Sequence, residues 1–308
     1  MKDLSLPVRV SQLDKNEDGC YWKVVVNCDY NEALLRAGFT SFRSYFYLPT
    51  GTVVKSIETR SIVRFEISGS VFFLKRHERE KQQNIAQKQS IAISYCSEGG
   101  KEFSNLCAFR RNGLATAIPV AMGENIWPDG TVESFLLTED FSPFVQLEYI
   151  IRNTPSKLAG PENIEKRGNI LRAVACYARK MHDKGFNHQD FNATHILLSD
   201  VEGGPPSVAL FDLQRVDQNR LQKFRWPIKA LAEFNYSSLE NDIFSDAERL
   251  FLFRIYRKKE QGTLTLFERF QWALIWLKTK RIAIHTAKIH ARKRISSDQP
   301  SSSRDADG

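Results

Sequence analysis

The chain has 308 residues, of which 42% are hydrophobic and 26% are charged. This composition excludes fibrous and disordered classes, and the length allows one large domain or two lobes around a cleft. Early acidic residues and the lack of an apolar segment at the N-terminus predict no signal peptide. The strictly apolar run near the C-terminus, residues 272–277, is far shorter than the roughly 20 residues of a membrane-spanning helix.

The five cysteines are irregularly spaced and form no Cys-x-x-Cys pair. This spacing indicates neither a disulfide framework nor a zinc site. Reduced thiols in the cytoplasm are therefore expected.

The formal net charge of +8 is concentrated near the C-terminus. Residues 278–294 contain seven Lys or Arg and no acid, so the rest of the chain is nearly neutral. Such a run can bind nucleic acid or an anionic membrane surface, or it can be a solvated helix end. Residues 296–308 are poor in apolar side chains and are expected to be disordered.

Up to about residue 140 the sequence predicts strands and one helix. β-branched and aromatic runs separated by short turns predict an antiparallel meander. The apolar residues Phe103, Leu106 and Phe109 have helical spacing and predict a helix over 101–113, closed by Gly113. The predicted strands are 44–49, 51–57, 61–67 and 70–76 in the meander, followed by 117–124 and 133–140.

The pattern becomes mainly helical after Pro143. An apolar stripe predicts a long helix that ends near Gly185, with Ile170, Val174, Tyr177 and Met181 on one face. Two short strands at 195–199 and 207–212 follow, and helices are predicted again from Arg225 onward, most clearly over 246–259 and 266–281.

This element order predicts an α+β fold of the two-lobe, protein-kinase-like kind. Residues 1–140 would form a β-rich nucleotide-binding lobe with one helix, and residues 141–277 a helical lobe with the catalytic loop. Residues 278–308 would form a basic helical tail with a disordered C-terminus.

The loop at residues 185–200 contains His188, Asp190, Asn192 and His195 within a short distance. By itself it could be a hydrated surface turn or a metal site built from the histidines. A kinase-like fold offers a third reading, since His-x-Asp with an Asn five residues after the Asp is its catalytic loop. Asp190 would then orient the acceptor hydroxyl and receive its proton, while His188 supports the loop.

Three further residues complete the expected set. Lys75 ends a strand and could reach nucleotide phosphates, while Glu102, near the start of the following helix, could hold Lys75 in place. Asp212 ends an apolar strand and would bind Mg²⁺, which prefers carboxylate oxygen. Lys75 could also be an exposed strand end, and Glu102 could merely favour a helix start. Together with Asp190, however, the four residues occur in the expected order and on the expected elements.

Two positions depart from the kinase pattern. The turn before Arg60 has no glycine-rich loop to cover the phosphates, so Arg60 is either a cationic clamp in its place or an ordinary hairpin arginine. Position 195 is His, and imidazole is a poor ligand for Mg²⁺. Either Asn192 supplies the oxygen or only one ion is held tightly. Glu139, at the end of the last strand before the helical lobe, is a further candidate for nucleotide binding.

These residues resemble the lipopolysaccharide kinases, which phosphorylate heptose or Kdo sugars of the bacterial inner core. His195 is typical of the heptose-kinase branch, whereas Asn192 is more similar to the Kdo-kinase branch. The resemblance implies transfer of the γ-phosphoryl group of ATP to a sugar hydroxyl, with Mg²⁺ as cofactor. It runs from about Phe42 to Tyr256 and is carried by segments 41–56, 72–77, 101–124, 188–198, 210–216 and 225–238.

The resemblance also implies an acceptor met at the cytoplasmic face of the inner membrane, with the protein peripheral there. The basic tail could then dock on anionic lipid. Ile275, Ile282 and Ile289 recur every seven residues, either as an amphipathic face or as packing against the body.

Three other functions remain open from the sequence. They are a kinase for another small molecule or protein, a pseudokinase scaffold that lacks transfer, and a nucleic-acid binder. The last is disfavoured by the nearly neutral body. The sequence does not indicate an oligomeric state.

Overall fold

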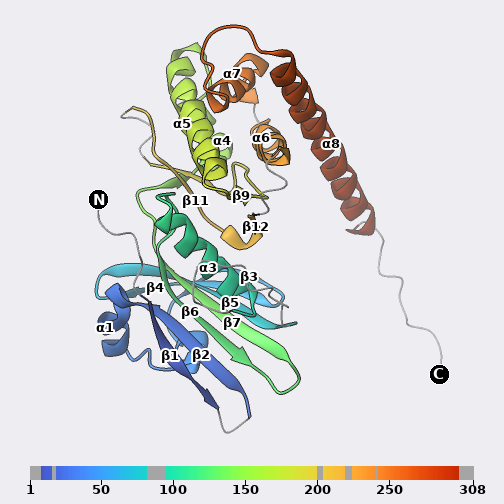
Figure 1. Ribbon diagram of the computed structural model, residues 1–308. Coiled ribbons are helices and arrows are strands. Elements are labelled where there is room, and N and C mark those ends of the chain that lie inside the picture. Colours follow the sequence, from blue (N-terminus) through green and yellow to red (C-terminus); the bar gives the residue numbers. More distant parts are fainter. Residues whose placement is uncertain are drawn as a thin grey trace, which may run out of the picture.

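The computed structural model describes residues 8–15, 19–81, 95–199, 204–218, 224–239 and 242–297. Figure 1 shows a β-rich part formed by the N-terminal half of the chain and a helical part formed by the C-terminal half. The protein-kinase-like order of a strand-rich lobe before a helical lobe, as expected from the sequence, is therefore present.

The N-terminal lobe is built on a seven-stranded antiparallel sheet in the order β1-β2-β6-β7-β5-β4-β3. The consecutive pairs β3–β4 and β4–β5 form the meander that the sequence predicts. The strands are β1 (Val8–Lys15), β2 (Tyr21–Asn27), β3 (Thr52–Ile57), β4 (Arg60–Ile67), β5 (Ser70–Lys81), β6 (Pro119–Ile126) and β7 (Thr131–Glu139).

Alternation along the central strands buries both faces of this sheet. Leu136 belongs to the core shared with α3 (Glu98–Arg111), whereas Leu137 belongs to a separate cluster with α1 (Cys28–Arg36) and α2 (Phe42–Phe46). Successive side chains of a strand point to opposite faces, which explains the division. The core on the α3 side continues into the helical lobe and joins the two lobes.

The strand predicted at residues 44–49 is wrong, because α2 occupies its first half and the second half is not a strand. The Ser41 hydroxyl accepts from the Ser44 backbone N–H, and the Ser44 hydroxyl accepts from the Ser41 N–H in return. This reciprocal cap starts a short helix whose rings Phe42, Tyr45 and Phe46 are buried. Local capping and aromatic burial on a helical face thus override the β-propensity of the aromatic run.

The helical lobe places two small β-sheets beside its helices. β8 (Val145–Gln146), β10 (Ile196–Leu198) and β11 (Val208–Leu210) form one, and β9 (Asn187–His188) pairs with β12 (Val216–Asp217) in the other. The lobe's helices are α4 (Leu147–Asn153), α5 (Ile164–Asp183), α6 (Arg225–Ser237), α7 (Asp246–Tyr256) and α8 (Leu266–Ser297), with 3₁₀ turns at Pro155–Lys157, Pro161–Asn163 and Leu213–Arg215.

The long helix α5 carries the stripe read from the sequence. Ile170, Val174 and Met181 are fully buried and Tyr177 is nearly so. The helix ends at Asp183, and Gly185 follows with a φ of +88°. That left-handed conformation favours glycine, so the break falls where the sequence indicates it.

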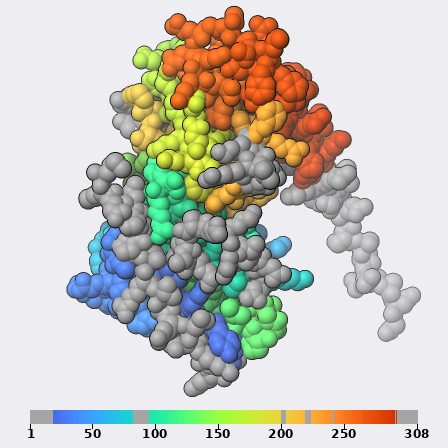
Figure 2. Space-filling model, viewed as in Figure 1, coloured from blue at the N-terminus to red at the C-terminus, as the bar shows by residue number. Residues whose placement is uncertain are grey.

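The last helix, α8, packs along α6 and then extends away from the body (Figures 1 and 2). It runs unbroken across the boundary predicted at residue 278. Ile275 is fully buried and Ile282 packs against the core, whereas Ile289 is 38% exposed. The stripe of these three residues therefore serves mainly to pack α8 on the lobe. Of residues 296–308, which were predicted to be disordered, Ser296 and Ser297 belong to α8, and 298–308 lie outside the described residues.

Among the described helices, none combines the length and apolar character needed to cross a bilayer.

Candidate active site

A cavity of about 630 Å³ lies between the sheet and the helical lobe. Five residues that the sequence singles out line it: Lys75, Glu102, Glu139, His195 and Asp212. Its apolar walls were not recognised from the sequence, because they come from elements distant along the chain. These wall residues include Ile62, Phe73, Leu106, Leu136, Phe141, Phe144, Leu197 and Phe211.

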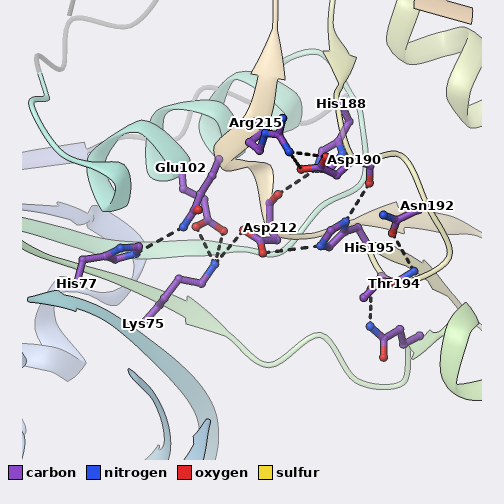
Figure 3. Close-up of polar contacts among 12 residues, drawn as sticks. Lys75, His77, Glu102, His188, Asp190, Asn192, Thr194, His195, Asp212 and Arg215 are labelled. Carbon is purple, nitrogen blue, oxygen red and sulfur yellow. Dashed lines mark hydrogen bonds and ion pairs between the residues drawn. The ribbon is translucent and has the colours of Figure 1, made fainter. Parts of the chain in front are cut away.

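Lys75 stands at the centre of an ion network across the cavity (Figure 3). It shares one face of β5 with Phe73, while Leu74 between them is buried on the other face. Its Nζ lies 3.0 and 2.8 Å from the two carboxylate oxygens of Glu102 and 3.2 Å from Asp212 Oδ1. Burial favours the neutral amine, but the two carboxylates outweigh it and raise the pKa of Lys75. The ammonium is therefore fixed in its charged form.

Asp212 follows β11 in a left-handed conformation, with a φ of +57°. A non-glycine residue pays a conformational cost there, and such strain is concentrated at functional sites. The turn after it is held by α3, since Asn105 Nδ2 donates to the Leu213 carbonyl at 2.7 Å. Burial would raise the pKa of Asp212, but Lys75 and His195 lower it below its usual value. Asp212 is thus an ionised carboxylate aimed into the cavity.

The two histidines of the loop at residues 185–200 contact the backbone at Asp190 and Asp212. His188 Nε2 lies 3.0 Å from the Asp212 carbonyl, and His195 Nδ1 lies 2.9 Å from the Asp190 carbonyl. A carbonyl only accepts, so each of these ring nitrogens carries a proton. Burial lowers the pKa of His188 to about 4, which keeps its ring neutral at neutral pH. His188 therefore braces the Asp212 turn.

His195 presents its other nitrogen to Asp212. Nε2 lies 3.8 Å from Asp212 Oδ2. Because Nδ1 is the nitrogen that donates to the Asp190 carbonyl, Nε2 is the one that faces Asp212. Metal-binding histidines likewise donate one ring N–H to a backbone carbonyl, and that bond fixes the direction of the other nitrogen.

Figure 3 shows Asp190 beside Arg215, on the other side of Asp212 from Lys75. Asp190 is absent from the described lining of the cavity. Arg215 Nη1 contacts both of its carboxylate oxygens, at 2.8 and 3.1 Å. The sequence reading did not find this partner, because Arg215 follows Asp190 by 25 residues and reaches it only through the pairing of β9 with β12.

Two of the residues proposed from the sequence are placed away from the cavity. Arg60 is exposed at the start of β4 and is not part of the described lining. Asn192 turns back on its own loop, where its side-chain oxygen accepts from the Thr194 backbone N–H at 3.0 Å (Figure 3). Of the two residues considered as a second metal ligand, only His195 faces Asp212.

A strand lysine held by a helix carboxylate, an ionised Asp after a strand and an Asp-bearing loop beside one cavity define a protein-kinase-like phosphotransferase. The fold agrees with that of a solved structure, "WaaP in complex with acyl carrier protein". It has a TM-score of 0.62 and 23% identity, over 84% of this chain and 97% of that one.

The family model for the lipopolysaccharide kinase (Kdo/WaaP) family matches residues 46–256, and the chain belongs to this family. It is thus an ATP-dependent sugar kinase of lipopolysaccharide, as the sequence predicts. Its relatives include the lipopolysaccharide core heptose(I) kinases WaaP of Escherichia coli and Pseudomonas aeruginosa. Each is 28% identical over 71% of this chain, covering 85% and 84% of the relative's length respectively.

Proposed function

We propose that this kinase phosphorylates a heptose hydroxyl of the lipopolysaccharide inner core, with Asp190 as the catalytic residue. The observation that carries the proposal is that Lys75, Glu102 and Asp212 line one cavity and Asp190 lies beside it. The choice of heptose is supported by the names of the relatives and by His195, which is typical of the heptose branch.

In this proposal the cavity holds ATP. The apolar walls can enclose the adenine base, and the Lys75 ammonium, on strand β5, can contact the phosphates. Glu102 keeps that ammonium extended by accepting two short hydrogen bonds from it. A cation already positioned and desolvated stabilises the charge that develops on the transferred phosphoryl group without further reorganisation.

The residues present fit one Mg²⁺ ion. Asp212 offers an ionised carboxylate. His195 Nε2 lies beside it, but imidazole is a poor ligand for Mg²⁺, so Asp212 is the ligand expected from this pair. One carboxylate suits Mg²⁺, which usually takes one or two carboxylates and completes its shell with phosphates and water. When bound, the ion would neutralise charge on the phosphates.

Asp190 would act on the acceptor. Because it lies next to the cavity but outside its described lining, it can meet a hydroxyl that approaches from the opposite side to the nucleotide. The carboxylate would orient this hydroxyl and accept its proton as the oxygen attacks the phosphoryl group. The backbone carbonyl of Asp190 is held by His195, which fixes the loop relative to Asp212.

The function is tested by transfer of labelled γ-phosphate from ATP to purified lipopolysaccharide core acceptors in the presence of Mg²⁺. We expect label on a heptose, located by fragment mass spectrometry of the product. Removal of Mg²⁺ by a chelator should stop transfer. Label on Kdo would contradict the choice of sugar, and ATP binding without transfer to any core acceptor would favour another acceptor or a pseudokinase.

We also propose that the outer face of α8 docks the enzyme on the anionic inner face of the inner membrane. Leu266, Phe270, Leu277 and Ile284 follow one another at intervals of four and seven residues, which places them on one side of the helix. They are 83%, 56%, 49% and 57% exposed. This outer stripe is a different face from that of the buried Ile275. Exposed cations of the described part of α8 include Lys280, Arg281 and Lys288.

Docking through the outer stripe predicts that Leu277→Asp weakens binding to vesicles of anionic phospholipid. The change removes about 1.5–3 kcal/mol of apolar burial and adds repulsion, so affinity should fall at least about tenfold in co-sedimentation. Leu35→Asp is the matched control, because Leu35 is 47% exposed but lies on α1 in the other lobe. Unchanged vesicle binding would contradict the proposal. The proposal would also be contradicted if the outer stripe bound acyl carrier protein, the partner in the solved relative, and did not bind vesicles.

A further inference from the structure

The carboxylate of Asp190 is occupied by Arg215. This arginine comes from the 3₁₀ turn that follows Asp212, and its side chain is 60% exposed. Its Nη1 contacts both oxygens of Asp190. An acceptor hydroxyl that approaches this carboxylate therefore meets Arg215 at both oxygens, and moving Arg215 away would clear the carboxylate for it.

A second cation stands beside the first. Lys229 Nζ on α6 lies 3.2 Å from Gln189 Oε1, and Arg215 Nη2 lies 3.3 Å from the same oxygen. Two cationic groups thus share one neutral amide oxygen. Burial and the nearby Arg215 both lower the pKa of Lys229, as expected for cations held close together.

The neighbouring charged groups do not neutralise Arg215 and Lys229. Lys278 on α8 also lowers the pKa of Lys229, so it adds to the positive field. The carboxylates are Asp190 and Glu233, and burial together with Asp190 raises the pKa of Glu233. Three cations therefore face two carboxylates, one of which is shifted toward its neutral form. Such a cluster is suited to an anion.

These cations are not placed to serve the nucleotide. Neither Arg215 nor Lys229 belongs to the described lining of the cavity, which contains Lys75 and Asp212. Arg215 lies beside Asp190, away from Lys75 (Figure 3). Any group that they bind would therefore belong to the acceptor.

We propose that Arg215 and Lys229 form a subsite for an anionic substituent of the acceptor, a carboxylate or a phosphate, close to the hydroxyl that reacts. The inference rests on the proposed role of Asp190. A planar guanidinium binds such groups through two parallel hydrogen bonds, and the ammonium adds a point charge. Binding of the substituent draws Arg215 away from Asp190, which frees the carboxylate for the hydroxyl proton. A neutral acceptor leaves the ion pair intact.

The test compares acceptors and variants in one cycle. Wild type and Lys229→Gln are assayed with native core acceptor, with acceptor whose carboxylates are converted to neutral amides, and with acceptor stripped of phosphate. We expect the kcat/KM of wild type to fall about 10- to 100-fold on one neutralised acceptor, as for loss of a charged hydrogen bond. In Lys229→Gln the ratio of kcat/KM between the native and the neutralised acceptor should shrink to about threefold or less, because the effects of two groups in contact are not additive. Lys229→Arg should restore most of it.

If the amidated acceptor is the poorer substrate, the substituent is a carboxylate. If the acceptor stripped of phosphate is the poorer substrate, the substituent is a phosphate. Lys184→Gln, at an exposed position after α5, is the matched control and should keep the full ratio. An equal loss for Lys229→Gln on every acceptor overturns the subsite. The affinity of each variant for each acceptor is then measured by calorimetry, with a non-hydrolysable ATP analogue present. If the effects of Lys229→Gln and of acceptor neutralisation on affinity are coupled but no phosphate is transferred, the subsite stands and the proposed kinase reaction is refuted. If the two effects on affinity simply add, the subsite is overturned.

Discussion

Asp212→Asn is expected to reduce phosphoryl transfer about 10³-fold or more, with little change in the thermal unfolding of the protein. The amide keeps the shape of the carboxylate but loses the charge that would hold Mg²⁺ and that pairs with Lys75, and metal stabilisation of the transferred group is worth several kcal/mol. Asparagine tolerates the left-handed backbone at this position, so the turn should survive. The measurements are kcat with core acceptor and the cooperativity of melting.

Asp183→Asn is the matched control for this substitution, because Asp183 is an exposed carboxylate at the end of α5 that pairs on the surface with Arg179, at 3.4 Å. It should leave activity unchanged and melting nearly so, since an exposed pair of this kind contributes little to stability. A second measurement separates metal binding from other losses. In wild type, Mg²⁺ should strengthen the binding of a non-hydrolysable ATP analogue, and in Asp212→Asn this effect should disappear. Near-normal turnover in Asp212→Asn would refute the assignment of the metal to this residue.

Asp190→Asn should lower kcat about 10²- to 10⁴-fold, the usual contribution of a general base. The KM for ATP should change little, because Asp190 is outside the described lining of the cavity. The substitution also removes the partner of Arg215. Steady-state kinetics with ATP and acceptor varied separately would measure both effects.

The opposite pattern would contradict this role of Asp190. If Asp190→Asn raised the KM for ATP and left kcat near the wild-type value, Asp190 would be a nucleotide contact and not the group that receives the proton. The Asp183→Asn variant again serves as the control, since it removes one carboxylate from the same lobe without touching the site.

Several parts of the fold could be read from the sequence because they depend on neighbours along the chain. The β-branched and aromatic runs of β4 and β5, the apolar stripe of α5 and the glycine after it are local signals. The three elements lie at the expected places, although β5 continues past its predicted end at residue 76 to Lys81. The failure at α2 has a local cause as well, since the cap between Ser41 and Ser44 outweighed the β-propensity of the aromatic residues. The two strands and the helix before residue 40 were not recognised.

The sequence by itself determined the class of this protein. A lysine on a strand, a glutamate on the next helix and two aspartates after it are patterns in residue type and order, and they led to the lipopolysaccharide kinase family that the family model establishes. The tertiary structure alone decided which partners these residues have. It placed Arg215 on Asp190, turned His195 and not Asn192 toward Asp212, and selected which face of α8 is exposed. Such contacts join residues far apart in the chain, and they depend on how the elements pack, which spacing along the sequence does not encode.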